Sequence, residues 1–147
     1  RYLNLVSQLN INMTNKSKKI LSEISPGELL DKISILEIKL KMVKDEDGLK
    51  EIKKEYNILK DIENSSLELT DEIKNLFKLI KEVNTTLWDI EDKLRFFEKN
   101  KNFGEDFIKQ AREVYFNNDK RAKIKLDINK LLGSNIREIK QYTNYQN

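Results

Sequence analysis

The sequence predicts an all-α protein, an antiparallel bundle of about five helices with one long helix over residues 71–99. Only four Gly and one Pro occur in 147 residues, and Lys, Glu, Leu and Ile are abundant, which favours helix over sheet. Apolar side chains also recur every three or four positions, as they do on one face of a helix. The length is typical of one domain. We expect an N-terminal arm over residues 1–24, a helical domain over 25–133 and a tail over 134–147.

The clearest helix start lies at Ser25. Ser25 can cap the helix, Pro26 suits its first position, and Glu28 has the spacing of a capping box. The body of this helix, over about residues 26–44, is apolar on two sides, so we expect other helices to cover both sides and pack around it as a hub. One broad face carries Leu29, Leu30, Ile33, Leu36, Leu40 and Val43, and the second stripe carries Ile35, Ile38 and Met42.

Four further helices are expected, with turn and capping residues between them. Gly48 punctuates the connection after the hub, and Thr70 is placed to cap the long helix. The segment 117–119 (Asn-Asn-Asp) is interpreted as a break, after which Asp119 caps the last helix and Gly133 follows its end. The expected bounds are about residues 49–63, 71–99, 105–116 and 119–132.

Several polar side chains fall on or beside apolar faces. Glu37 lies at the edge of the hub's main face, Asp31 lies beside its second stripe, and Glu91 projects within the apolar sector of the long helix. A buried carboxylate without a partner is costly, so we expect Glu37 and Glu91 each to meet a Lys, Arg, Tyr or Trp donor. Arg95, one turn after Glu91, is one such donor. Trp88 is expected to lie mainly in the core.

Composition excludes several classes of function. The chain has no Cys and no His, which excludes disulfides, thiol catalysis, Cys-ligated zinc and a Ser-His-Asp hydrolase. No apolar run approaches the ~20 residues that span a bilayer, and no secretory signal is recognisable, so we expect a cytoplasmic protein. The first residue is Arg1, and Met13 is a candidate native start, which would place residues 1–12 outside the native protein.

Two functions from different classes are compatible with the charged residues. The favoured one is a non-enzymatic module that binds a partner protein or a small anionic ligand, with Arg121 and Lys125 just inside the helix that Asp119 is expected to cap. The alternative is a Mg²⁺-dependent, all-helical nucleotide pyrophosphohydrolase, whose metal would be held by carboxylates spaced by three residues. Such pairs are Glu28 with Asp31 and Asp89 with Asp92, and Glu37 and Glu91 would be additional ligands. No cofactor is expected other than Mg²⁺ under this alternative.

A third function, nucleic-acid binding, is the least favoured because the formal net charge is only +3. Its candidate residues alternate with apolar positions near the end of the chain and are Lys120, Arg121, Lys123, Lys125 and Lys130.

Long helices with wide apolar faces also favour a homodimer.

Four motifs resemble an uncharacterised family of small, all-helical bacterial and phage proteins. They are residues 25–39 (SPGELLDKISILEIK), 87–92 (LWDIED), 103–107 (FGEDF) and 114–125 (VYFNNDKRAKIK). Members of that family often occur with glycosyltransferases of surface-polysaccharide synthesis, so the resemblance implies an accessory role and no established activity. The polar residues of these motifs, with Arg95 added, form the candidate ligand-binding set. That set is Asp31, Lys32, Glu37, Lys39, Trp88, Glu91, Asp92, Arg95, Asn118, Asp119, Arg121 and Lys125.

Overall fold

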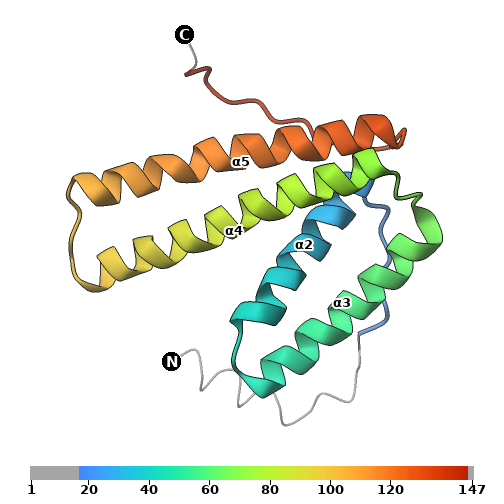
Figure 1. The fold of residues 1–147 in the computed structure, drawn as a ribbon, viewed down its shortest axis with the longest axis horizontal. Helices are drawn as coiled ribbons and strands as arrows, with labels where there is room; N and C mark the ends of the chain where they lie inside the picture. The colour runs from blue at the N-terminus through green and yellow to red at the C-terminus, as the bar shows by residue number, and fades with distance from the viewer. Residues whose placement is uncertain (1–16, 146–147) are drawn as a thin grey trace.

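The computed structural model describes residues 17–145 and places four helices and no strand in them (Figure 1). The helices are α2 (Pro26–Met42), α3 (Glu46–Ser66), α4 (Asp71–Lys99) and α5 (Glu105–Leu131). The all-α class is therefore confirmed, and the long helix has its predicted bounds. The proposed native start at Met13 lies outside the described residues. None of these four helices combines the length and apolar character that crossing a membrane requires.

The expected fifth helix is wrong, because α5 continues through the segment 117–119 where a break was predicted. The amide of Asn117 donates to the Glu113 carbonyl oxygen at 2.8 Å and to the Glu113 carboxylate at 3.2 Å. Asn117 thus bonds to the preceding turn of its own helix instead of to a competing local turn. Asp119 consequently lies in the middle of α5 and caps nothing, so the helix N-terminus predicted there as an anion site does not exist.

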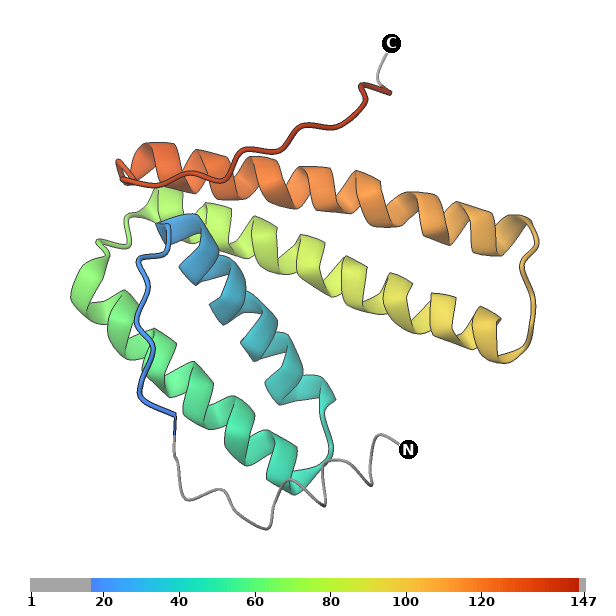
Figure 2. The same cartoon turned by 180° about the vertical axis from the view of Figure 1, so that it is seen from behind.

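The prediction of a central hub is confirmed. Helix α2 packs against α3, α4 and α5, whereas α3 comes close to α2 alone among the described helices. Figures 1 and 2 show α4 and α5 as a long antiparallel hairpin, with α2 lying against only one end of it and α3 alongside α2. The core at that end is built mainly from the broad face of α2, and its buried members are Leu29, Leu30, Ile33, Ile73 and Ile128.

Local capping explains where the helices begin. The Ser25 hydroxyl oxygen accepts a hydrogen bond from the Glu28 amide at 3.1 Å, and the Thr70 hydroxyl oxygen accepts one from the Ile73 amide at 3.3 Å, as predicted. Helix α3 begins earlier than expected because the Asp45 carboxylate accepts from the Gly48 amide at 2.6 Å. Gly48 therefore belongs to the first turn of α3 and does not end a loop.

The first turn of α2 approaches α5 very closely. The Gly27 amide donates to the Asn129 side-chain oxygen at 2.7 Å, and both residues are buried. A Cβ atom at Gly27 would lie 2.5 Å from the backbone oxygen of Lys125, well inside any real contact distance. Glycine at this position therefore allows the two helices to meet.

The chain reverses direction after α5. Gly133 has a positive φ of 61°, the Gly133 amide donates to the Lys130 carbonyl at 3.3 Å, and the Ser134 amide donates to the Asn129 carbonyl at 2.8 Å. These two bonds form a Schellman motif, which confirms the predicted role of Gly133. The C-terminal segment, residues 134–145, then runs back along α5 before rising away from it (Figure 2).

Candidate functional site

A group of polar side chains is buried where α2, α4 and α5 meet. The Asn84 amide nitrogen donates to the Asp31 carboxylate and to the Ser34 hydroxyl, each at 2.8 Å. The Ser34 hydroxyl in turn donates to the backbone oxygen of Asp31 at 2.7 Å. All three residues are buried, and these bonds satisfy polar atoms that would otherwise be costly to remove from water. These three residues, together with the neighbouring charged residues Glu28, Arg121 and Lys125, form what we call the polar cluster.

Lys125 of α5 neutralises the acidic part of the polar cluster. Its ammonium nitrogen lies 2.6 Å from a Glu28 carboxylate oxygen and 3.6 Å from oxygens of both Asp31 and Glu138. Burial by itself lowers the pKa of Lys125, but the bond to Glu28 and the surrounding carboxylates outweigh burial and raise this pKa overall. The same hydrogen bond from Lys125 lowers the pKa of Glu28. Lys125 therefore stays charged and joins α2, α5 and the C-terminal segment.

Arg121 is the cation of the polar cluster that lacks an anionic partner. Its guanidinium donates to the Asn84 side-chain oxygen at 3.4 Å, and it forms no ion pair with any carboxylate in residues 17–145. Arg121 is half-buried, and a guanidinium has five N–H donors in a planar fork. The charge of Arg121 also helps to lower the pKa of Glu28, after the larger effect of Lys125, and Asn84 accepts the one side-chain hydrogen bond found for Arg121 within residues 17–145.

Arg121 also lines an open cleft between α5 and the C-terminal segment, which we call the tail cleft. The tail cleft has a volume of about 710 Å³ and is lined by Tyr115, Asn118, Asp119, Arg121, Lys140, Tyr142, Thr143 and Tyr145. The Tyr145 hydroxyl donates to the Asp119 carboxylate, and this bond raises the pKa of Tyr145 to about 12. The ring of Tyr145 packs edge-on against Tyr115 at 5.5 Å between centroids. Two cations, one carboxylate and several aromatic rings therefore meet around one hollow.

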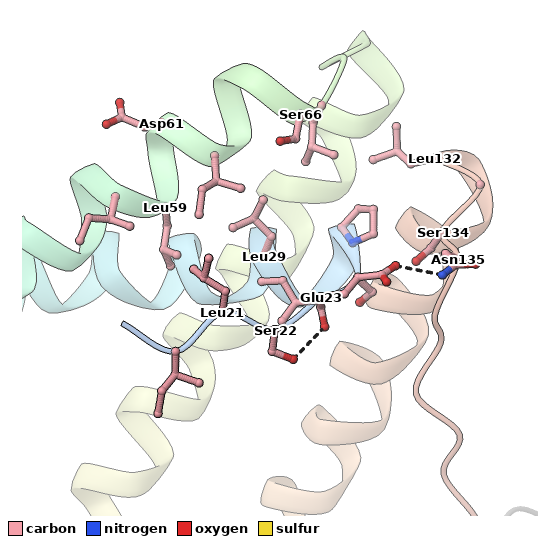
Figure 3. Close-up of a pocket in the computed structure, with 18 of the residues that line it drawn as sticks. Leu21, Ser22, Glu23, Leu29, Leu59, Asp61, Ser66, Leu132, Ser134 and Asn135 are labelled. Atoms are coloured by element: carbon pink, nitrogen blue, oxygen red, sulfur yellow. Dashed lines mark hydrogen bonds between the residues drawn. The ribbon is translucent and has the colours of Figure 1, made fainter. Parts of the chain in front are cut away.

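A larger cavity of about 940 Å³ lies at the other end of the C-terminal segment. Figure 3 shows Leu21 of the N-terminal segment, Leu29 of α2 and Leu59 of α3 gathered around it. The Asn135 amide donates to the Glu23 carboxylate at 3.1 Å across its edge. None of the candidate residues from the sequence lines this cavity, so it is not the site that the motifs indicated.

The structure brings together part of the predicted set. Asp31, Arg121 and Lys125 belong to the polar cluster, and Asn118 and Asp119 line the tail cleft beside Arg121. The remaining members lie elsewhere. Lys32 is exposed and Lys39 is half-buried on α2, and Trp88, Glu91, Asp92 and Arg95 lie farther along α4.

Glu37 forms a separate ion pair and confirms the expectation that it meets a donor. Its carboxylate lies 2.5 Å from the Lys81 ammonium and accepts a bond from the Tyr56 hydroxyl at 3.4 Å. Burial, followed by the charge of Glu37, raises the pKa of Tyr56. These contacts join α2, α3 and α4, and they involve no residue of the tail cleft.

The pairing predicted for Glu91 is confirmed, but its predicted place in an apolar sector is wrong. The Glu91 carboxylate pairs with Arg95 one turn later, and its side chain is 48% exposed. Trp88 is half-buried and Asp92 is exposed. The physical reason is that α2 packs only against the other end of the hairpin, so α5 is the one described helix that lies beside this part of α4 (Figure 1).

Of the residues named for metal and nucleic-acid binding, some are exposed as expected, namely Lys120, Lys123 and Lys130, whereas others are engaged in the polar cluster. Glu28 and Asp31 face Lys125, and Asp89 and Asp92 are exposed on α4. In the described part of the chain, no three His, Cys, Asp or Glu residues are grouped so that they could hold a metal ion. Lys125 points into the polar cluster, with only 12% of its side chain exposed, and does not fan outward with its neighbours.

Sequence reasoning missed several residues of the site. Ser34 and Asn84 are polar residues on helix faces that the apolar spacing assigns to the core, and this is the signal that could have found them. Glu138, Lys140 and Tyr145 reach the site through the chain reversal after α5, and no local pattern indicates such a return.

The fold and the site together define a class: an all-α protein in which a buried polar cluster supports a cation at the wall of an open cleft. Comparison with known families then assigns the chain to one of them. The chain belongs to the family of unknown function DUF6165, whose model matches residues 20–146. No curated protein and no solved structure matches the chain. The matched range includes the polar cluster and all the residues that line the tail cleft.

Proposed function

We propose that this protein is a non-enzymatic binding module that takes a small anionic ligand, bearing a carboxylate or phosphate group, in the tail cleft. The observation that carries the proposal is Arg121, a half-buried guanidinium with no ion-pair partner in residues 17–145. Arginine binds carboxylate and phosphate through two parallel charge-assisted hydrogen bonds. An anion in the tail cleft would supply the acceptors that Arg121 lacks.

The charges around the tail cleft support an anion. Its lining carries the cations Arg121 and Lys140 against the single carboxylate of Asp119, which already accepts from Tyr145. Lys125, in contrast, is occupied by Glu28 and Asp31 inside the polar cluster. Lys140 lies 3.9 Å from a Glu138 carboxylate oxygen, so Arg121 is the lining cation that forms no ion pair within residues 17–145.

The polar cluster would orient this binding group. Asn84 accepts from Arg121 and donates to Asp31 and Ser34, so the position of the guanidinium depends on a buried network that spans α2 and α4. A binding group fixed in advance loses less entropy when the ligand arrives. Aromatic side chains such as Tyr142 give the same hollow apolar walls against the rest of a ligand.

The family resemblance extends the proposal. It supports an accessory role in bacterial surface-glycan synthesis in the cytoplasm, through the ligand or through a protein partner, and it makes sugar phosphates and nucleotide sugars the first ligands to test. A Mg²⁺-dependent pyrophosphohydrolase is the weaker alternative, because it would need Glu28 and Asp31 as metal ligands while both already face Lys125.

Isothermal titration with inorganic phosphate, a sugar 1-phosphate and a nucleotide sugar tests the proposal. We expect at least one of them to bind and Arg121→Met to weaken it by about 10- to 100-fold, since a hydrogen bond to a charged group contributes roughly 1.5–3 kcal/mol. Lys120→Met, which removes an exposed cation from the adjacent position and does not line the tail cleft, should bind as the wild type does. Absence of binding to all three anions, or equal losses in both variants, would overturn the proposal.

A further inference from the structure

The tail cleft presents charges of both signs to one hollow without pairing them. Asp119 and Arg121 lie two positions apart on α5, and both line the cleft. Within residues 17–145 these two side chains form no ion pair with each other, and the Asp119 carboxylate instead accepts a hydrogen bond from the Tyr145 hydroxyl. A guanidinium and a carboxylate therefore face the same space as two separate recognition groups.

The carboxylate is the unexpected member of this pair. Like charges brought together at an interface repel one another, so Asp119 opposes any ligand whose only polar group is an anion. A ligand that also carries a hydrogen-bond donor would satisfy both side chains, with its anion at Arg121 and its donor at Asp119. Asp119 thus distinguishes between anions according to what else they carry.

The contact with Tyr145 indicates which donor suits Asp119. Its carboxylate already accepts from a hydroxyl group at the edge of the cleft, and a carboxylate has about four acceptor positions, so a second hydroxyl can bond there too. An ammonium group would be repelled by the cations Arg121 and Lys140, which line the same hollow. A hydroxyl group is neutral and avoids this repulsion.

The size and walls of the tail cleft suit a ligand larger than a single anionic group. Its volume of about 710 Å³ lies within the range of roughly 300–1,000 Å³ that is typical of sites for small organic molecules. The rings of Tyr142 and Tyr115 are 73% and 43% exposed and can cover the carbon skeleton of such a molecule. The amide of Asn118 and the hydroxyl of Thr143 add polar groups to the lining.

We propose that Asp119 is a specificity-determining residue, which selects anions that also carry hydroxyl groups. The ligand of the tail cleft is then a hydroxylated phosphate or carboxylate, held by Arg121 at its anionic group and by Asp119 at a hydroxyl group. This inference rests on the proposed function, because Arg121 must bind the anion.

Isothermal titration with ribose 5-phosphate and n-pentyl phosphate tests the inference. The two probes have the same phosphate group and the same number of carbon atoms, but the second has no hydroxyl group. Asp119→Ala should weaken binding of ribose 5-phosphate by about 10-fold, because its hydroxyl groups lose a charged acceptor. The same variant should bind n-pentyl phosphate as tightly as the wild type or more tightly, since a like charge has been removed. Retained binding of n-pentyl phosphate also shows that the variant is folded.

Two variants separate the carboxylate from other effects of the change. Tyr145→Phe removes the hydrogen bond between the C-terminal segment and α5 but keeps the carboxylate, so the ratio of the two affinities should remain that of the wild type. Asp127→Ala removes another half-buried carboxylate of α5, which does not line the tail cleft, and should change neither affinity.

The outcomes distinguish this inference from the proposed function. Equal losses of both probes in Asp119→Ala, or the same change of ratio in Tyr145→Phe, would overturn the role of Asp119 while leaving anion binding at Arg121 intact. Absence of binding of both probes to the wild type would overturn the proposed function and this inference together.

Discussion

The same two helices behave differently at their two ends. Where α2 crosses them, α4 and α5 contribute buried apolar residues such as Ile80 and Ile128 together with the buried Asn84. At the other end, residues 91–113, which we call the hairpin tip, no residue is fully buried. Both stretches have amphipathic spacing. The spacing thus indicates which face of a helix is apolar, whereas burial depends on whether another helix arrives to cover it.

The largest expected effect comes from shortening a core side chain at the covered end. Ile80→Ala should lower the free energy of unfolding by about 4 kcal/mol, because it opens a cavity at a position with no solvent exposure. Leu94→Ala, in the hairpin tip, should lower it by only about 1 kcal/mol in the monomer, since part of the side chain is already in water. Urea unfolding at low protein concentration measures both, and equal losses would contradict the comparison.

Removing Lys125, the cation that forms ion pairs within the polar cluster, should have the next largest effect. Lys125→Met leaves Glu28 and the buried Asp31 without their ammonium partner, and we expect a loss of roughly 3 kcal/mol at neutral pH. The exposed pair of Lys101 with Glu98 in the hairpin tip is the matched control. Lys101→Met should change stability by less than about 1 kcal/mol, because exposed ion pairs contribute little.

The dependence of the free energy of unfolding on pH tests the pair of Lys125 and Glu28 at both acid and alkaline pH. The folded pKa of Glu28 lies below its ordinary value of 4.5, so its contribution is complete above pH 4.5 and is lost as the pH falls through the folded pKa. The folded pKa of Lys125 lies above 10.5, so its contribution is complete below pH 10.5 and is lost as the pH rises through the folded pKa. Lys125→Met should flatten both limbs of the curve, and an unchanged acid limb would exclude the pair as its cause.

A smaller effect is expected at Asn84. Asn84→Ala removes both donors to Asp31 and Ser34, and a buried group left without its partner costs about 2 kcal/mol. The exposed neighbour Thr85 is the control, and Thr85→Ala should stay within about 0.5 kcal/mol of the wild type. Thermal unfolding measures both changes. Asn84→Ala should also weaken anion binding, since Arg121 loses the group that holds it; intact affinity would show that Arg121 is positioned by other contacts.

Local features of the fold could be predicted from the sequence. The caps at Ser25 and Thr70, the turn at Gly133 and the bounds of α4 all depend on residues within a few positions of one another. The same reasoning failed at Asn117, because a side chain that can end a helix can also bond back into it. Which outcome occurs depends on the helix that continues on either side.

The candidate site was only partly predictable for a different reason. The sequence points to Asp31 by its place beside an apolar stripe, and to Arg121 and Lys125 by a motif and a helix start that the structure does not have, but their partner Asn84 comes from another helix. Glu91 is partly exposed, and not surrounded by apolar side chains as its spacing predicts, because the sequence does not say how far α2 reaches along α4. Contributions from the C-terminal segment, such as Lys140, depend on a chain reversal that only the folded structure reveals.

The bonds that hold α2 to α5 have a consequence for the order of folding. Gly27 and Asn129 are separated by 102 positions in the chain, and Glu28 and Lys125 by 97. The pairings of α2 with α3 and of α4 with α5 join consecutive helices and close only short loops, which is rapid. Each hairpin should therefore form early and the two should dock afterwards, so that the polar cluster is the last part of the molecule to assemble.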